Sequence, residues 1–140
     1  MGESEEKFIH SYTLGRKNDF SWKIDDYCNI YIKTASGDVK KHPRKVKENE
    51  LKQLDFFMKE KGWVELSSGS SHMHAQGMDE FFINKLKWTK TDAQLSGYLG
   101  TIFYNAGVWD YRKKEGMIQC RRIADNWCKL VRQYFEKSQG

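Results

Sequence analysis

The chain of 140 residues contains one proline, three cysteines and no long hydrophobic run. Cys28, Cys120 and Cys128 are too few and too unevenly spaced for the disulfide framework of a small secreted domain, so we expect reduced cysteines. No apolar stretch approaches the ~18 residues that a membrane-spanning helix needs, and we therefore expect no membrane partner. The acidic start, residues 1–6, lacks the basic and apolar regions of a signal peptide. These absences predict an intracellular, cytoplasmic protein, and a nuclear location is also consistent with them.

The sequence also lacks the motifs of common enzyme classes. It has no glycine-rich phosphate loop, no nucleophile elbow and no paired metal-ligand motif. His72 and His74 could join a metal site only through a low-complexity stretch. Asp25 and Asp26 lie in an expected turn, where solvated carboxylates are common. We therefore predict a non-enzymatic protein with no catalytic residues, no metal and no cofactor.

Aromatic residues and positive charges, by contrast, are abundant. Phe, Trp and Tyr make up 14% of the chain, and each can bury a large apolar area, so the composition argues against disorder. The formal net charge is +5. Residues 71–140 contain 11 Lys and Arg against 7 Asp and Glu, whereas residues 1–70 contain 13 against 12. A basic surface is therefore expected in the second half.

One low-complexity stretch divides the chain. Residues 67–77 are mostly small, polar or glycine and can bury little apolar surface, which predicts a flexible linker. Two interpretations stay open. The stretch is either a natural loop or an engineered junction between two polypeptides, because Gly-Ser-Ser-His-Met resembles the residues that cloning sites leave behind. In either case we predict two units, over residues 8–66 and 78–137.

The first unit has the pattern of a small α+β fold. Alternating residues predict strands, Pro43 either places the third strand at a sheet edge or breaks it, and Gly62 ends the helix. The expected order is strand, strand, strand, helix and strand, over residues 20–24, 27–34, 39–46, 48–61 and 63–66. We predict a small antiparallel sheet with one packed helix.

The second unit is predicted to be mainly helical, so that the whole chain is of the α+β class. Helices are expected over residues 79–86, from Thr91 or Asp92 to 106, and over 117–136. The prediction of the last helix is based on apolar residues spaced by three and four, namely Cys120, Ala124, Trp127, Val131 and Tyr134. A helix-turn-helix over residues 92–134 is an alternative, but the connector at 107–116 is longer than the usual turn of ~3–4 residues.

Basic residues on this expected helix and its connector indicate a nucleic-acid interface, because a positive row suits a phosphate backbone. The predicted members are Arg112, Lys113, Lys114, Arg121, Arg122, Lys129 and Arg132. A second basic cluster comprises Lys40, Lys41, Arg44, Lys45 and Lys47. Lysines and a proline on an edge strand can alternatively discourage association between strands.

Tyr27, Tyr31 and Lys33 are predicted to share one strand face, on which single-stranded bases could stack unless a helix covers it. We therefore predict a small nucleic-acid-binding protein, a regulator that uses the basic C-terminal helix for phosphate contacts, without distinguishing DNA from RNA. The alternative is a protein–protein interaction module with aromatic anchors and a basic face for an acidic protein. In that case the two units could be tethered polypeptides that bind each other, or the chain could form a homodimer.

Overall fold

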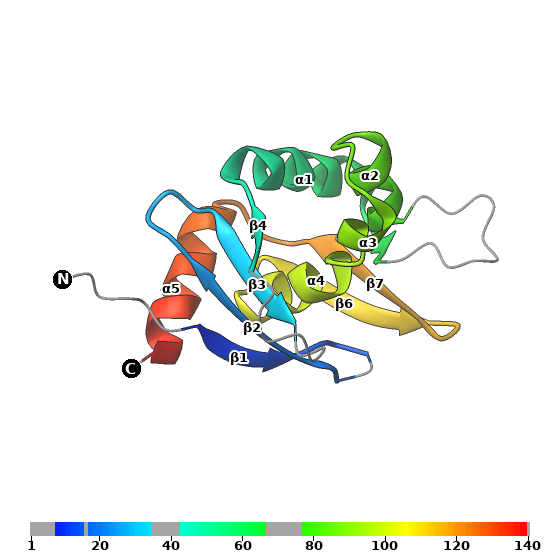
Figure 1. Cartoon of the computed structure of the whole chain (residues 1–140). Helices are drawn as coiled ribbons and strands as arrows, with labels where there is room; N and C mark the ends of the chain where they lie inside the picture. The colour runs from blue at the N-terminus through cyan, green and yellow to red at the C-terminus, as the bar shows by residue number, and fades with distance from the viewer. Residues whose placement is uncertain (1–7, 16, 35–42, 67–76, 140) are drawn as a thin grey trace.

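The computed structural model describes residues 8–15, 17–34, 43–66 and 77–139. Within them the chain forms two antiparallel sheets and a set of helices (Figure 1), which confirms the predicted α+β class. The strands are β1 Ile9–Tyr12, β2 Asp19–Ile24, β3 Ile30–Thr34, β4 Arg44–Val46, β5 Val64–Glu65, β6 Trp109–Lys114 and β7 Met117–Arg122. The helices are α1 Glu48–Lys61, α2 Met78–Asn84, α3 Lys90–Ala93, α4 Ser96–Asn105 and α5 Trp127–Gln139. None of these helices is both long and apolar enough to cross a membrane.

The first sheet contains strands β1 to β4 in sequence order. Burial alternates as predicted along β2 and through Ile30 and Ile32 of β3, whereas Thr34 at the end of β3 is exposed. The buried face carries Phe20, Trp22, Ile24, Ile30 and Ile32. Strand β1 was not predicted. Of the expected strand over 39–46, β4 is the observed part, and residues 39–42 and the turn at 35–38 lie outside the described residues.

Helix α5 packs on the buried face of this sheet (Figure 1). The Trp22 ring stacks on Tyr134 with a centroid distance of 6.1 Å and contacts Phe135 at 5.5 Å. Helix α4 contributes Tyr98, whose ring lies 4.9 Å from that of Phe20. Helix α1 has the predicted bounds and ends at Gly62, which has φ 76°, but it packs against β7 of the other sheet. The helix on the first sheet is therefore a different one from the helix that the sequence suggested.

The second sheet has the order β5-β7-β6 and corrects the prediction of a helix over residues 117–136. Strands β6 and β7 form a hairpin in which Lys114 pairs with Met117. The two turn residues, Glu115 and Gly116, have φ values of 54° and 81°, as a tight hairpin turn requires. Pairing of β7 with both β5 and β6 outweighs the helical apolar spacing, so the last helix begins only at Trp127. A strand in the expected connector also excludes the helix-turn-helix alternative.

The helix expected from Thr91 or Asp92 to 106 is divided into α3 and α4. Its N-cap is Thr89 rather than Thr91 or Asp92, because the Thr89 hydroxyl accepts a hydrogen bond of 3.0 Å from the backbone N–H of Asp92. The expected helix over residues 79–86 corresponds to α2.

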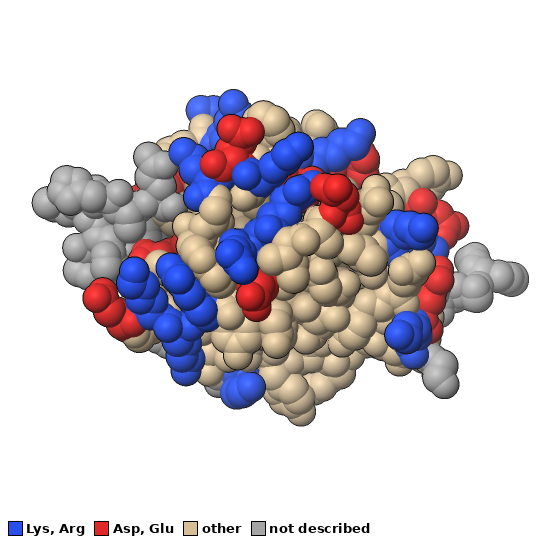
Figure 2. Space-filling view, turned by 180° about the vertical axis from the view of Figure 1, so that it is seen from behind, with Lys and Arg blue, Asp and Glu red and all other residues tan. Residues whose placement is uncertain are grey.

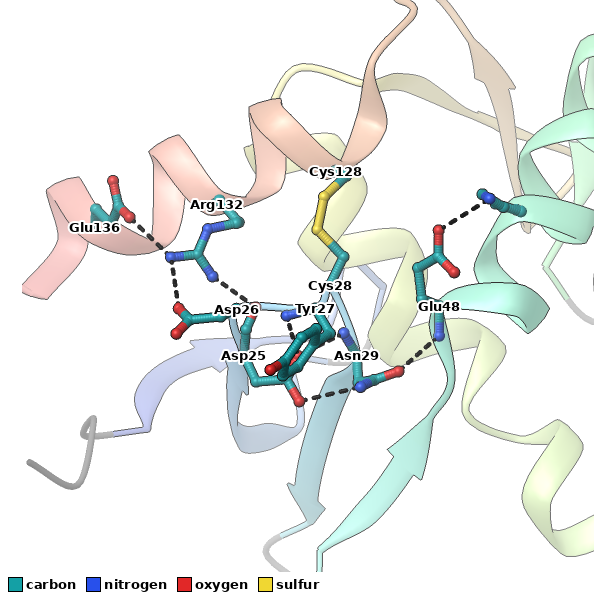
Figure 3. Close-up of a disulfide and its surroundings, with 10 residues drawn as sticks. Asp25, Asp26, Tyr27, Cys28, Asn29, Glu48, Cys128, Arg132 and Glu136 are labelled. Carbon is teal, nitrogen blue, oxygen red and sulfur yellow. Dashed lines mark hydrogen bonds and ion pairs between the residues drawn. A yellow bond between two sulfur atoms is a disulfide. The ribbon is translucent and has the colours of Figure 1, made fainter. Parts of the chain in front are cut away.

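A disulfide joins Cys28, in the turn between β2 and β3, to Cys128 in α5 (Figure 3). Their Cα atoms lie 5.9 Å apart, a usual distance for a disulfide. The expectation of reduced cysteines is therefore wrong for this pair. Cys120 is a free, buried cysteine of β7, and burial together with the nearby Asp110 carboxylate raises the pKa of its thiol to about 12.

Elements on both sides of the predicted linker contribute to one hydrophobic core. Strand β5 pairs with β7, and a Cβ on Gly100 of α4 would lie 3.0 Å from the Leu66 side chain. A larger residue at this position would therefore displace the end of the Leu66 side chain by a few tenths of an ångström. Residues 67–76 lie outside the described residues, and Gly77 is the N-cap of α2. The unit boundaries 8–66 and 78–137 stay a prediction.

Candidate nucleic-acid interface

Arg122 of β7 takes part in an internal ion-pair network. Its Nε lies 2.8 Å from Asp55 Oδ1 of α1, and its Nη2 lies 2.8 Å from Asp125 Oδ1. The side chains of Arg122 and Asp55 are only 14% and 18% exposed. The Asp55 carboxylate, as hydrogen-bond acceptor and opposite charge, raises the pKa of Arg122. This guanidinium therefore joins helix α1 to the second sheet and is not free to bind phosphate.

Arg132 of α5 is also held internally (Figure 3). Its Nη1 donates a hydrogen bond of 2.5 Å to the backbone carbonyl of Asp25. Its Nη2 lies 3.4 Å from an Asp26 carboxylate oxygen and 3.1 Å from Glu136 Oε2. Arg44 of β4 likewise forms an ion pair with Asp92 of α3. Three of the predicted phosphate ligands are therefore neutralised by neighbouring acidic groups.

The other predicted C-terminal residues do not form one row. Arg112 and Arg121 lie on adjacent strands, with their guanidinium carbons 4.1 and 4.9 Å from the centre of the Trp63 ring. Arg112 also donates a hydrogen bond of 2.8 Å to Gln119. Both arginines are exposed, as are Lys113 and Lys114 on β6 and Lys129 on α5.

Figure 2 shows one face of the molecule, on which Lys and Arg form several groups interleaved with Asp and Glu. The predicted row on a single helix is thus wrong in geometry, because Arg121 and Arg122 belong to a strand.

A more continuous group of free cations lies on the first sheet, on the face opposite the core. The register places Lys23, Tyr31 and Lys45 side by side on β2, β3 and β4. The ammonium nitrogens of Lys23 and Lys45 lie 5.2 and 5.9 Å from the centre of the Tyr31 ring. Phe8 adds a second ring, with Lys23 at 5.3 Å and Lys33 at 4.5 Å. We call Phe8, Lys23, Tyr31, Lys33 and Lys45 the open face.

The three lysines of the open face form no ion pair with any acidic side chain in the described part of the chain. Helices α4 and α5 make their ring contacts on the opposite side of the sheet, with Phe20 and Trp22. Among the described residues, the alternative in which a helix covers the Tyr31 face is therefore not realised. At the far end of this face, Tyr12 is 55% exposed and contacts the His10 ring at 5.1 Å.

Tyr31 is positioned by the turn that precedes β3, whose residues Asp25 and Asn29 are labelled in Figure 3. Asp25 Oδ2 accepts hydrogen bonds from the Tyr31 hydroxyl at 3.0 Å and from the Asn29 amide at 3.1 Å. Asp25 Oδ1 accepts from the backbone N–H groups of Tyr27 and Asn29, both at 2.9 Å. Partial burial acts to raise the pKa of Asp25, but these hydrogen bonds outweigh it and leave the pKa lowered.

The same arrangement affects Tyr31, since burial and its hydrogen bond to Asp25 raise the pKa of the phenol. Tyr27, predicted to share a face with Tyr31, lies in this turn and is 80% exposed.

The second predicted basic cluster is only partly described. Lys40 and Lys41 lie outside the described residues. Lys45 belongs to the open face, and Lys47 is exposed just before α1, where its backbone N–H donates to Glu50.

Phe8 and Lys23 were missed by the sequence reasoning. The alternation of Phe20, Trp22 and Ile24 already placed Lys23 on the outer face of its strand, but Phe8 had no comparable signal.

Comparison with protein-family models, with curated proteins and with solved structures finds no match for this chain. Within the described ranges, no three His, Cys, Asp or Glu side chains are grouped so that they could hold a metal ion.

Proposed function

We propose that this protein binds single-stranded nucleic acid on the open face of its four-stranded sheet. The observation that carries the proposal is the cross-strand row in which Lys23 and Lys45 flank the Tyr31 ring, next to Phe8 and Lys33. Aromatic rings on an antiparallel sheet offer platforms on which bases stack, and each stacked base contributes ~1–3 kcal/mol. Lysines around the rings supply phosphate contacts.

The lysines can change partner when a strand binds. An exposed cation–π contact is worth about 0.5–1 kcal/mol, so each ammonium can leave its ring at small cost and contact a phosphate. The bases then occupy the ring faces that the lysines vacate. Readout by stacking is tolerant of sequence, because every base has an aromatic face. The proposal is therefore a non-enzymatic protein of low sequence specificity, and a regulatory role would rest on that binding.

The proposal keeps the class of ligand expected from the sequence but changes the surface. Phosphate contacts by the C-terminal positions would have to come from exposed side chains such as Lys113, Lys114 and Lys129. A cytoplasmic location stays a prediction, and the Cys28–Cys128 disulfide weighs against it because disulfides persist mainly in oxidising compartments.

The test is fluorescence anisotropy with labelled oligouridine and oligothymidine strands of about 20 nucleotides, a length that exceeds the ~4–16-nucleotide sites of small single-strand-binding folds. We expect Tyr31→Leu to weaken binding about tenfold, because a stacking platform is lost. Tyr31→Phe is the matched control. It removes the hydroxyl that bonds Asp25 but keeps the ring, and it should bind within about twofold of the unmodified chain. Equal affinity of the Leu and Phe variants would contradict stacking on Tyr31.

A further inference from the structure

Helices α1 and α2 form a groove of about 550 Å³ with a mainly aromatic interior. It lies on different elements from the open face. The lining residues are Lys52, Gln53, Phe56, Phe57, Glu60, Lys61, Phe81 and Lys85. On α1 they form two neighbouring rows with a spacing of four, so the groove runs along this helix, and Phe81 of α2 and Lys85 at its C-cap complete the lining.

The interior of the groove contains three phenylalanines with different roles. The rings of Phe57 and Phe81 stack across the two helices with a centroid distance of 4.5 Å and are partly buried against the core. Phe56 is 64% exposed, although large apolar side chains are usually removed from water. A ring that projects from a helix beside an apolar floor is an anchor point for a partner's apolar side chains.

The edge of the groove is basic. Lys61 and Lys85 are exposed and have no ion-pair partner among the described residues, and Lys52 lies 3.3 Å from Glu48. Glu60 is the one acidic residue in the lining. A second copy of the chain is a poor occupant, because a symmetric contact would bring two basic groove edges into one interface. A partner with carboxylates beside an apolar stripe complements both the edge and the floor.

We infer that this groove binds an amphipathic helical segment of a partner protein, with apolar side chains against Phe56, Phe57 and Phe81 and carboxylates opposite Lys61 and Lys85. From Lys52 to Lys61 the groove extends over about 14 Å of α1, at 1.5 Å per residue, which suits a few turns of helix. The inference goes beyond the proposed function. It gives the molecule a protein-binding site on α1 and α2, separate from the open face.

The test uses the full chain and two labelled helical peptides of about 12 residues, a length of about 18 Å. One peptide has leucines at positions i, i+3, i+4 and i+7 with glutamates elsewhere, and the other has every glutamate replaced by lysine. We expect the acidic peptide to bind at least about tenfold more tightly than the basic one. Phe56→Ala should weaken it by about tenfold. Lys61→Glu together with Lys85→Glu should reverse the preference, whereas Lys59→Glu, outside the groove on the same helix, should change it less than about twofold.

Several results would overturn the inference. Absence of acidic-peptide binding at about 1 mM, the weak limit of specific association, would do so. So would equal affinity for the two peptides, or a Phe56-dependent dimer in sedimentation, which would assign the groove to a second copy of the chain. Loss of oligonucleotide binding in the Lys61→Glu, Lys85→Glu variant would assign these lysines to the nucleic-acid surface instead. Because Tyr31 variants should leave peptide binding unchanged, this inference and the proposed function can fail independently.

Discussion

The open face of the first sheet and the C-terminal arginines Arg122 and Arg132 use positive charge in opposite ways. Arg122 and Arg132 are each held by two acidic side chains, and Arg132 also bonds a backbone carbonyl. The ammonium groups of the open-face lysines lie near aromatic rings and form no ion pair among the described residues. An arginine fork suits fixed, bidentate contacts, whereas a lysine is a mobile point charge. The comparison teaches that the density of basic residues in a sequence does not show which of them are free to bind.

The largest effect on stability is expected from the disulfide that joins the first sheet to helix α5. Replacing Cys28 and Cys128 together by serine removes a cross-link over a sequence separation of 100 residues. We expect the free energy of unfolding to fall by about 2–4 kcal/mol, because the unfolded chain regains conformational freedom. Urea unfolding of the oxidised protein and the double variant measures the loss. The prediction fails if the two midpoints coincide and mass spectrometry still finds the disulfide in the unmodified protein.

The next effect separates a structural arginine from an exposed one. Arg122→Gln leaves the partly buried Asp55 carboxylate without its main partner and should cost about 1–3 kcal/mol of stability. Arg121→Gln, at the neighbouring exposed position, should cost less than about 0.5 kcal/mol. Both variants should keep oligonucleotide affinity within about twofold. A large affinity loss without a stability loss in Arg122→Gln would show that this side chain contacts the ligand.

A smaller effect concerns the turn that positions Tyr31. Asp25→Asn should cost about 0.5–1.5 kcal/mol at neutral pH, because the carboxylate accepts hydrogen bonds at both oxygens. Since the pKa of Asp25 is lowered in the folded state, its contribution is present above the ordinary value of 3.8 and is lost as the pH falls through the folded pKa.

Urea midpoints of the unmodified chain and of Asp25→Asn should therefore converge below pH 3.8. A stability difference that stays constant from neutral pH into this acid range would contradict the assigned role of the carboxylate.

The smallest effect on stability is expected from substitutions of the open-face lysines. Changing Lys23, Lys33 or Lys45 singly to glutamine should alter the free energy of unfolding by only about 0.5 kcal/mol, since exposed cation–π contacts are weak and surface substitutions are usually small. A thermal unfolding scan at low salt measures this change. A collapse of the fold would show that these lysines hold the sheet together.

Local sequence patterns predicted part of the fold. Alternating Phe20, Trp22 and Ile24 identified a strand, and the apolar spacing before Gly62 gave α1 its bounds. The helix prediction was wrong from Met117 to Asn126. The apolar residues there also fit a helical period, whereas strand β7 depends on pairing with β5 and β6. Long-range strand pairing is not visible in local spacing.

The candidate site was predictable to a similar extent. Tyr31 and Lys33 were expected on one face, and the structure places them there. Their proximity to Lys45 follows from the pairing of β3 with β4, which local spacing does not determine. The sequence could not show that Arg122 reaches Asp55, a residue 67 positions away, and therefore overstated the number of free cations.

The central claim is that the phosphate-binding lysines lie on the open face and not at the C-terminal positions. It is tested most directly by the salt dependence of oligouridine binding in two matched variants, each with three lysines changed to glutamine. The first variant changes Lys23, Lys33 and Lys45, and the second changes Lys113, Lys114 and Lys129. For single strands each phosphate contact contributes about 0.7 to the slope of log K against log salt, so the first variant should lower the slope by about 2 and the second should leave it unchanged. The reverse pattern would contradict the account.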